Sequence, residues 1–371
     1  MKMRLVILTV VVVMVAALAA CGGQDDYVAV VAVEPVPMPT VEPVVTPEPI
    51  EELYEYEYED EDEPLVLSYG EHGYIAVNYI KFINDNLYGR VPFSYREKEA
   101  AMWLVDELLA IGYDEEYIEI QAFYKGEGGD AGQWIWHGRD TETGQWIMGG
   151  GEPRYYSQNV ILTVPGQSER RIIVGAHYDS LPYPGASDNA SGMALLLESA
   201  QRMLNEDNYF TIVYIFFGAE EIGLVGAHVY VESLSDEESE LIEFMVNADV
   251  LFEGPYLMYG IGRGRGMVTT SEFADRVSEI ALGVSEAHGV ELLTRPDVVF
   301  AGSDHLPFKW ARHYVVVLFG LDMRDDGGWS MRVLHSPDDD FHFIQEQWPG
   351  KIERNMRYFS IFLEELLLAR L

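Results

Sequence analysis

Short apolar runs alternate with longer segments of helical spacing through most of the chain, and this alternation constrains the fold more than any other feature. The runs are rich in β-branched residues, which is typical of strands buried on both faces. We therefore expect an α/β fold: a single domain whose mixed, mostly parallel central sheet is covered by helices on both faces. The expected strands are 159–164, 171–176, 210–217 and 314–319, and the expected helices are 73–87, 95–111, 190–204, 223–234, 271–287 and 349–370.

The first twenty residues have the pattern of an export signal. Lys2 and Arg4 precede an apolar run from Leu5 to Ala20, which is the charged start and hydrophobic middle of a secretory signal. The run ends in Leu18-Ala19-Ala20-Cys21, which resembles the lipobox of bacterial lipoproteins, where the cysteine receives lipid and becomes the new N-terminus. The resemblance implies an exported protein, anchored through lipid on Cys21 to the outer face of the bacterial cell membrane. An uncleaved membrane anchor would give the same topology.

The next segment is acidic and rich in proline. Residues 22–64 hold 14 Asp and Glu with no Lys or Arg, and seven prolines lie between residues 33 and 64. Because proline favours extended backbone and like charges repel, we expect a semi-rigid spacer rather than a folded unit. An acidic tail that binds metal or a partner is the alternative. The predicted division is a signal peptide at 1–20, a disordered lipid-anchored tether at 21–70 and a catalytic domain at 71–371.

Charge and cysteine content exclude several classes of protein. The formal net charge is -38, which repels phosphate backbones and argues against nucleic acid as a partner. Cys21 is the single cysteine, so an intramolecular disulfide, a cysteine zinc site and an iron–sulfur cluster are excluded. A metal ion would have to be held by histidines and carboxylates.

Clusters of such residues follow several of the expected strands. Taken one at a time they are weak signals, since an Asp-Asn turn often caps a helix and a Glu-Glu pair is usually solvated. In chain order the clusters are His177-Tyr178-Asp179, the Gly-rich turn Gly185–Gly192 with Asp188 and Asn189, Glu220-Glu221, Asn247-Ala248-Asp249 and His335-Ser336-Pro337-Asp338-Asp339. Their positions just after strands are where ligands gather in doubly covered α/β folds.

In order and context these motifs resemble those of the secreted bacterial di-zinc aminopeptidases, metallopeptidase family twenty-eight, to which glutaminyl cyclases are related. The resemblance covers about 159–345 and implies a cell-surface zinc-dependent aminopeptidase that binds two Zn²⁺ per chain and removes N-terminal residues from peptide substrates. It implies that His177 and Asp249 hold one zinc, that Glu221 and His335 hold the other, that Asp188 bridges them, that Glu220 is the general base, and that Asp179 orients His177.

The chemistry of these residue types agrees with that assignment. Zinc binds imidazole nitrogen and carboxylate oxygen, and a bridging carboxylate can keep two ions about 3.5–4 Å apart. Two zinc ions polarise a carbonyl and lower the pKa of a bound water, and a neighbouring glutamate can take the proton of that water. A carboxylate near a ligating histidine fixes the tautomer and orientation of the ring.

Several alternatives remain open at this point. Gly302-Ser303-Asp304-His305 resembles a further motif of the family, and His305 competes with His335 as the last ligand. The function could be that of a glutaminyl cyclase, which works with one zinc, of a carboxypeptidase or dipeptidase, or of a non-catalytic peptide-binding lipoprotein. The Trp- and Gly-rich stretch 125–152 suggests a hairpin or a wall of the substrate cleft, and the glycine-rich segment 260–266 suggests a flexible loop.

Overall fold

The computed structural model describes residues 64–125, 131–136, 156–268, 270–295, 302–324 and 328–370, and of 131–136 it describes only the backbone. The expected signal, the lipobox and the tether up to residue 63 lie outside the described residues, as does most of the stretch 125–152. Within the described residues, no helix has the length and apolarity needed to cross a membrane.

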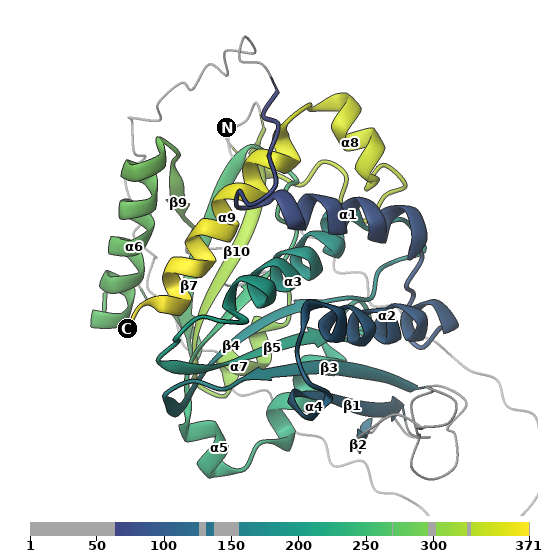
Figure 1. The fold of residues 1–371 in the computed structure, drawn as a ribbon, viewed down its shortest axis with the longest axis vertical. Coiled ribbons are helices and arrows are strands. Elements are labelled where there is room, and N and C mark those ends of the chain that lie inside the picture. The colour runs from purple at the N-terminus through teal and green to yellow at the C-terminus, as the bar shows by residue number, and fades with distance from the viewer. Residues whose placement is uncertain are drawn as a thin grey trace, which may run out of the picture. The chain divides into compact units, whose positions relative to one another are not determined.

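The described strands form one mixed sheet, in the order β2-β1-β3-β5-β4-β6-β10-β7-β8, with β9 beside β7 and β11 beside β10 (Figure 1). The four central strands β5, β4, β6 and β10 run parallel, and β3 and β7 join them antiparallel on the two sides. Farther out, β1, β2 and β8 pair antiparallel with their neighbours, whereas β9 pairs parallel with β7. The strands are β1 (Ile118–Lys125), β2 (Ala131–Trp136), β3 (Tyr156–Val164), β4 (Ser168–His177), β5 (Phe210–Phe217), β6 (Ile242–Ala248), β7 (Tyr256–Arg263), β8 (Gly266–Met267), β9 (Leu292–Thr294), β10 (Tyr314–Met323) and β11 (Trp329–Ser330).

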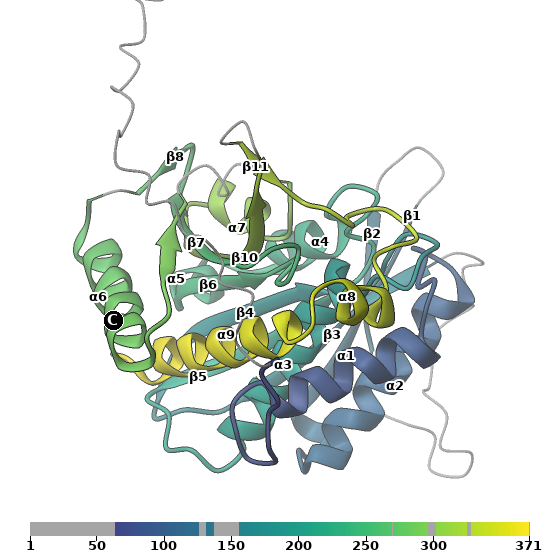
Figure 2. The same cartoon turned by 90° about the horizontal axis from the view of Figure 1, so that it is seen from above.

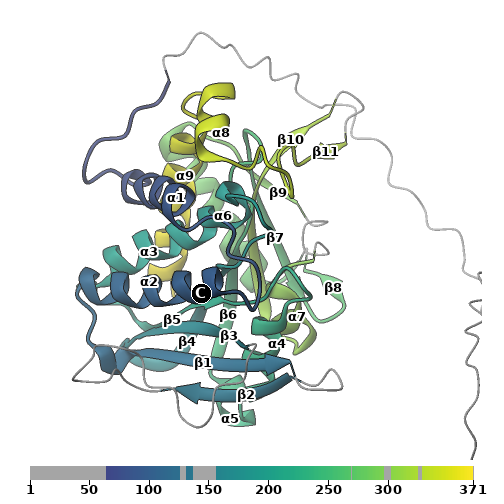
Figure 3. The ribbon, with the colours of Figure 1, turned by 90° about the vertical axis from the view of Figure 1, so that its right-hand side faces the viewer.

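Helices cover both faces of this sheet. One face packs against α1, α2, α3, α6, α8 and α9, and the other packs against α4 and α7 (Figures 2 and 3). The described helices are α1 (Tyr74–Asn86), α2 (Tyr95–Ile111), α3 (Ser191–Met203), α4 (Val225–Ser233), α5 (Asp236–Glu240), α6 (Glu272–His288), α7 (His305–Trp310), α8 (Phe341–Gln347) and α9 (Lys351–Leu368). Burial of apolar side chains on both faces explains the continuous apolar runs of the central strands.

The predicted α/β fold, with a mixed, mostly parallel sheet between two helical layers, is confirmed. Each expected strand lies within β3, β4, β5 or β10, and each expected helix overlaps a described one. The expectation of a flexible loop at 260–266 was wrong, because residues 260–263 complete strand β7, where Gly260, Ile261 and Gly262 pair with β10 and Arg263 pairs with Gly266 of β8. Of the Trp- and Gly-rich stretch 125–152, residues 131–136 form β2, which pairs antiparallel with β1 as a hairpin would, and residues 137–152 lie outside the described residues.

Two glycines allow close approaches that bring loops together at one edge of the sheet. A β-carbon on Gly192 would lie 2.4 Å from the main-chain oxygen of Ala248, so the start of α3 can contact the end of β6 only without a side chain there. A β-carbon on Gly218 would lie 2.3 Å from Ser157 Oγ. Any larger residue would therefore push the loop after β5 away from β3.

Candidate metal centre

The carboxyl ends of the parallel strands β4, β5 and β6 bring the predicted residues together. His177 is the last residue of β4, and Asp249 directly follows β6. In the parallel register Gly175 pairs with Asn247, so the next alternate positions place His177 level with Asp249. His177 also pairs with Phe217, the last residue of β5, and the chain then turns into Glu220 and Glu221.

Two groups of potential metal ligands result. His177, Glu220 and Asp249 form the first, and in each group the ligand atoms lie within 4.8 Å of one another. His177 Nε2 is 3.3 Å from Asp249 Oδ1 and 3.1 Å from Asp188 Oδ1. These two carboxylates therefore converge on the same ring nitrogen, Nε2.

The second group consists of Asp188, Glu221 and His335. His335 Nε2 lies 3.1 Å from Asp188 Oδ2 and 3.4 Å from Glu221 Oε2. Asp188 thus directs one oxygen to each histidine, which is the geometry that a bridging carboxylate requires. His335 is about half exposed, with 53% of its side chain accessible, whereas His177 and Asp188 are buried, so the second group lies nearer the solvent.

The spacing of these donors fits zinc. Donor atoms about 2.0–2.2 Å from a tetrahedral ion lie roughly 3.3–3.6 Å from one another, close to the four distances of 3.1–3.4 Å between histidine nitrogens and carboxylate oxygens. His177 Nδ1 is 3.1 Å from the main-chain oxygen of Asp179, to which it can donate. The Nε2 lone pair would then face two carboxylates, an arrangement that a cation between them stabilises.

The electrostatics show how much negative charge is gathered here. Burial raises the pKa of Glu220 well above its usual value, and burial together with Asp188 raises the pKa of Glu221 to about 7. Burial alone would lower the pKa of His177, but Glu220 and Asp249 raise it well above its usual range. Carboxylates so close together repel one another, and bound cations would offset that repulsion.

Asp179 supports the centre through its backbone and its side chain in different ways. Its main-chain oxygen makes the contact with His177 Nδ1, whereas its carboxylate lies 3.7 Å from that nitrogen. The carboxylate instead accepts the backbone N–H groups of Glu220 at 3.0 Å and Glu221 at 3.1 Å. The residue expected to orient the histidine therefore also fixes the loop that carries both glutamates.

The segment that contains His305 contributes a different residue from the one considered as a rival ligand. Ser303 Oγ donates to Asp249 Oδ2 at 2.7 Å and accepts from Asn247 Nδ2 at 2.8 Å. His305 is fully buried and belongs to neither ligand group found among the described residues. Ser303 orients Asp249, a role that the sequence motif alone did not reveal.

The buried cation Arg90 supports the turn that leads to Asp188. Arg90 is fully buried, and its guanidinium donates to the main-chain oxygens of Tyr178 at 2.6 Å, Pro184 at 3.0 Å and Gly185 at 3.2 Å. Burial lowers its pKa to about 10, which still leaves it charged at neutral pH. Arg90 thus fixes the turn before Asp188 and places a positive charge close to the acidic cluster.

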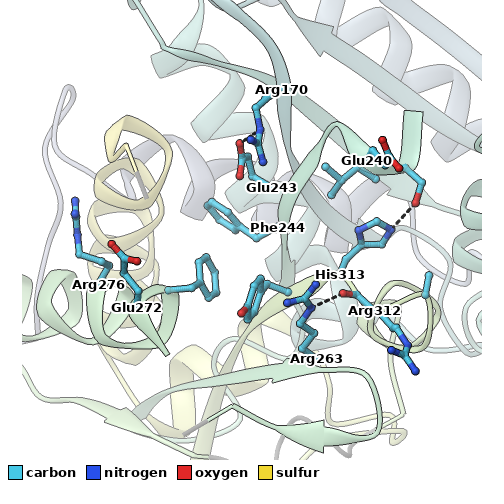
Figure 4. A pocket seen from close by; sticks show the side chains of 14 residues that line it. Arg170, Glu240, Glu243, Phe244, Arg263, Glu272, Arg276, Arg312 and His313 are labelled. Atoms are coloured by element: carbon cyan, nitrogen blue, oxygen red, sulfur yellow. Dashed lines mark hydrogen bonds and ion pairs between the residues drawn. The ribbon is translucent and has the colours of Figure 1, made fainter. Parts of the chain in front are cut away.

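The second group of candidate ligands borders a small hollow, while a larger cavity lies at the opposite end of the central strands. The small hollow is lined by Asp188, Glu221, His335 and Asp339. The larger cavity, about 650 Å³, includes Arg170, Glu243, Arg263 and His313 (Figure 4). Arg170 pairs with Glu243, and Arg263 donates to the main-chain oxygen of Arg312. We place the chemistry at the smaller hollow, because the ligand-type side chains converge there.

Comparison with known proteins agrees with this geometry. The sequence model of Peptidase family M28 matches residues 159–360, more than half of the 371-residue chain. A probable lipoprotein aminopeptidase, LpqL of Mycobacterium tuberculosis, is 41% identical over 100 residues, which cover 26% of this chain and 20% of LpqL. The first curated relatives are each matched over less than two thirds of their own length.

Solved structures show the same fold at low sequence identity. A zinc aminopeptidase from Bacillus subtilis superposes with a TM-score of 0.61 at 17% identity, over 81% of this chain and 96% of that one. A glutaminyl cyclase from an Acidobacteriales bacterium superposes with a TM-score of 0.57 at 16% identity, over 83% of this chain and 97% of that one. With the family match spanning all the strands that carry the candidate ligands, the chain belongs to peptidase family M28.

Proposed function

We propose that the protein is a zinc-dependent aminopeptidase that hydrolyses the N-terminal residues of peptides. The observation that carries this proposal is the position of Asp188 between His177 and His335, with one carboxylate oxygen 3.1 Å from each. Because each oxygen of this carboxylate faces a different histidine, the site suits two ions rather than one. In the proposed assignment the first zinc is held by His177, Asp249 and Asp188, and the second by Glu221, His335 and Asp188.

Zinc in these positions would supply Lewis acidity toward the scissile carbonyl and would lower the pKa of the attacking water. The chain supplies the proton transfer. Glu220 stands beside His177 and Asp249, and its carboxylate accepts no hydrogen bond from the described residues. It is therefore available to take a proton and to return it to the leaving amine, while Glu221 is held through Oε1 by the backbone N–H of Leu181.

A glutaminyl cyclase of the same fold is the second candidate, supported by the fold likeness to the Acidobacteriales enzyme. It would use one zinc ion, as the family resemblance implies for cyclases. Convergence of all five expected ligands favours the peptidase. Zinc content per active chain separates the two functions, since about two ions favour the peptidase and about one favours the cyclase. A protein that only binds peptides would need no general base, so the position of Glu220 beside His177 and Asp249 favours an enzyme.

We also propose that the enzyme is exported and held at the outer face of the cell membrane by lipid on Cys21. The signal-like pattern at 1–20, the resemblance to a lipobox at 18–21 and the similarity to LpqL, a probable lipoprotein aminopeptidase, support this location. The acidic, proline-rich residues 21–70 would then separate the catalytic domain, 71–371, from the membrane.

Hydrolysis of a panel of aminoacyl-4-nitroanilides, each with a free or an acetylated amino group, tests the proposed activity. We expect the purified protein to release nitroaniline from the free-amine compounds only, and to stop when a chelator is added. Release from acetylated compounds at equal rates would contradict an aminopeptidase. Failure on the whole panel, together with cyclisation of N-terminal glutamine, would favour the cyclase.

A further inference from the structure

The loop after β5, which carries both glutamates of the centre, is held by an unbroken series of side-chain acceptors. Four consecutive backbone N–H groups, from Gly218 to Glu221, each donate to a side-chain oxygen of another element. The acceptors are Asn159 Oδ1 for Gly218 at 3.1 Å, Glu97 Oε1 for Ala219 at 3.1 Å, and the two oxygens of Asp179 for Glu220 and Glu221 at 3.0 and 3.1 Å. The family match at 159–360 includes every one of these acceptors except Glu97.

The two oxygens of Glu97 bind different parts of the molecule. Oε2 accepts the backbone N–H of Phe93 at 2.5 Å, just before α2 begins. Oε1 accepts both the N–H of Ala219 and the hydroxyl of Ser157, the latter at 2.5 Å. Glu97 therefore joins the start of α2 to the loop that presents Glu220.

A helix-capping role alone does not explain this placement. The chain contains the same Ser-x-x-Glu pattern at Ser235 and Glu238, where the glutamate completes a capping box at the start of α5 and stays exposed. Glu97 is instead fully buried, with 0% of its surface accessible. Removing a carboxylate from water costs free energy that a surface cap does not incur, and here the loop amide and the Ser157 hydroxyl offset it.

The loop needs such support because its backbone is strained at the residue before the general base. Ala219 has φ 56°, in the left-handed region that residues with a β-carbon disfavour. Without the bond to Glu97, Ala219 could relax toward a more common conformation. A change of φ at Ala219 would swing the Glu220 side chain, which follows it directly.

We propose that Glu97 is a positioning residue for Glu220, acting through the backbone of Ala219. The inference rests on the proposed function, in which Glu220 moves the proton. Among the described residues, the hydrogen bonds of Glu97 go to none of the candidate metal ligands, and Glu97 does not line the small hollow. Its loss should therefore lower kcat while leaving KM and zinc content close to those of the wild type.

Glu97→Gln tests this with little change in shape. An amide is uncharged and has one acceptor oxygen, so it cannot accept both the N–H of Ala219 and that of Phe93, and the link between the start of α2 and the loop is broken in either orientation. We expect kcat to fall by about tenfold or more, because small displacements of a catalytic group have effects of up to about a hundredfold. KM and zinc per chain should stay within about twofold of the wild type.

Amide hydrogen exchange in the metal-free protein gives a readout that does not depend on activity. Exchange in the peptide that contains residues 218–222 should be faster in Glu97→Gln than in the wild type. Ser94→Ala is the matched control, because Ser94 Oγ accepts the N–H of Glu97 at the start of the same helix without contacting the loop. It should weaken α2 but leave exchange at 218–222 and kcat near wild-type values.

Three results would overturn the inference: an unchanged kcat in Glu97→Gln, unchanged exchange at 218–222, or an equal fall of kcat in Ser94→Ala, which would indicate general loss of stability. A wild-type protein that is inactive on every substrate would reject the proposed function instead. The exchange comparison would in that case still decide whether Glu97 holds the loop.

Discussion

The carboxylate of Asp339 accepts the backbone N–H of Asp188 at 3.0 Å, and its other oxygen accepts the N–H of Ser187 at 2.6 Å. Asp339 stands four positions after His335 in the sequence, yet it fixes the turn that presents the proposed bridging carboxylate. The late motif therefore supplies both a candidate ligand, His335, and the support of the proposed bridging residue, Asp188.

Asp339→Asn should weaken zinc binding. An asparagine keeps one acceptor but places NH₂ against a backbone N–H, so the Asp188 turn loses a hydrogen bond. Loss of such a support typically costs about 10–100-fold in metal affinity. Competition with a chromophoric chelator measures this, and Asp338→Asn, an exposed neighbour, is the control that should bind zinc like the wild type. Equal affinities in all three proteins would contradict the role of Asp339.

Glu220→Gln should separate proton transfer from metal binding. The amide cannot act as a base, and general acid–base catalysis is typically worth about 10²–10⁴-fold, so we expect kcat to fall within that range. Zinc per chain, measured by mass spectrometry, should remain at the wild-type value because Glu220 is not one of the proposed ligands. Wild-type turnover in the zinc-loaded variant would remove Glu220 from the mechanism.

Asp188→Asn should affect both metal sites at once. Its carboxylate oxygens lie 3.1 Å from His177 Nε2 and from His335 Nε2, and a neutral amide cannot balance two cations in the same way. We expect both zinc ions to bind more weakly, in contrast to His335→Ala, which should weaken only the second. Two ions bound at wild-type affinity in Asp188→Asn would exclude the bridging role.

His313 should make the protein less stable in mild acid. It is buried beside Arg263, and burial and that neighbouring charge lower the pKa of its imidazole. The unfolded chain, in which the pKa is about 6.5, then takes up a proton more readily than the folded chain. The free energy of unfolding should accordingly fall as the pH drops below about 6.5, by at most about 1.4 kcal/mol per pH unit.

Denaturant unfolding at pH 8 and pH 5.5, with a chelator present throughout, measures this contribution. Subtracting the result for His313→Gln removes the effect of other groups, and glutamine can keep a hydrogen bond to Ser239, whose hydroxyl lies 3.1 Å from His313 Nε2. The loss between the two pH values should be smaller in His313→Gln, and unchanged in His288→Gln, which replaces an exposed histidine. Equal losses in all three proteins would refute the prediction.

Cys21→Ala should release the protein from the membrane fraction if lipid on that thiol is the anchor. The wild type should fractionate with membranes and carry a mass increase on its N-terminal peptide. Membrane association that persists in the variant would favour the uncleaved apolar anchor instead.

Strands whose pattern lies within a short stretch of sequence could be predicted from the sequence alone. The central parallel strands were predictable because each is a continuous apolar run, as in 210–217. The flanking strands were harder to predict, since polar Glu119 and Gln121 interrupt β1 and Gly260 and Gly262 lie within β7, and glycine weakens a strand signal. Strand β7 pairs with β10, which is distant in the sequence, so no local pattern marks it.

The same limit applies to the centre. The order of the motifs in the sequence identified the candidate ligands, and the structure brings them together. The contacts that support these ligands, however, come from side chains of other elements. Ser94 and Glu97 have the pattern of a helix start, and that pattern does not show that one oxygen of Glu97 binds Ala219. Similarly, the sequence could not show that the Asp179 carboxylate, 3.7 Å from His177 Nδ1, also accepts the backbone N–H groups of Glu220 and Glu221.

Anomalous diffraction from crystals of the zinc-saturated protein, recorded on both sides of the zinc absorption edge, tests the central claim most directly. We predict two zinc peaks per chain on either side of the Asp188 carboxylate, one beside His177 and Asp249 and the other beside Glu221 and His335. A single peak, or peaks away from these residues, in crystals of protein that hydrolyses aminoacyl substrates would contradict the account.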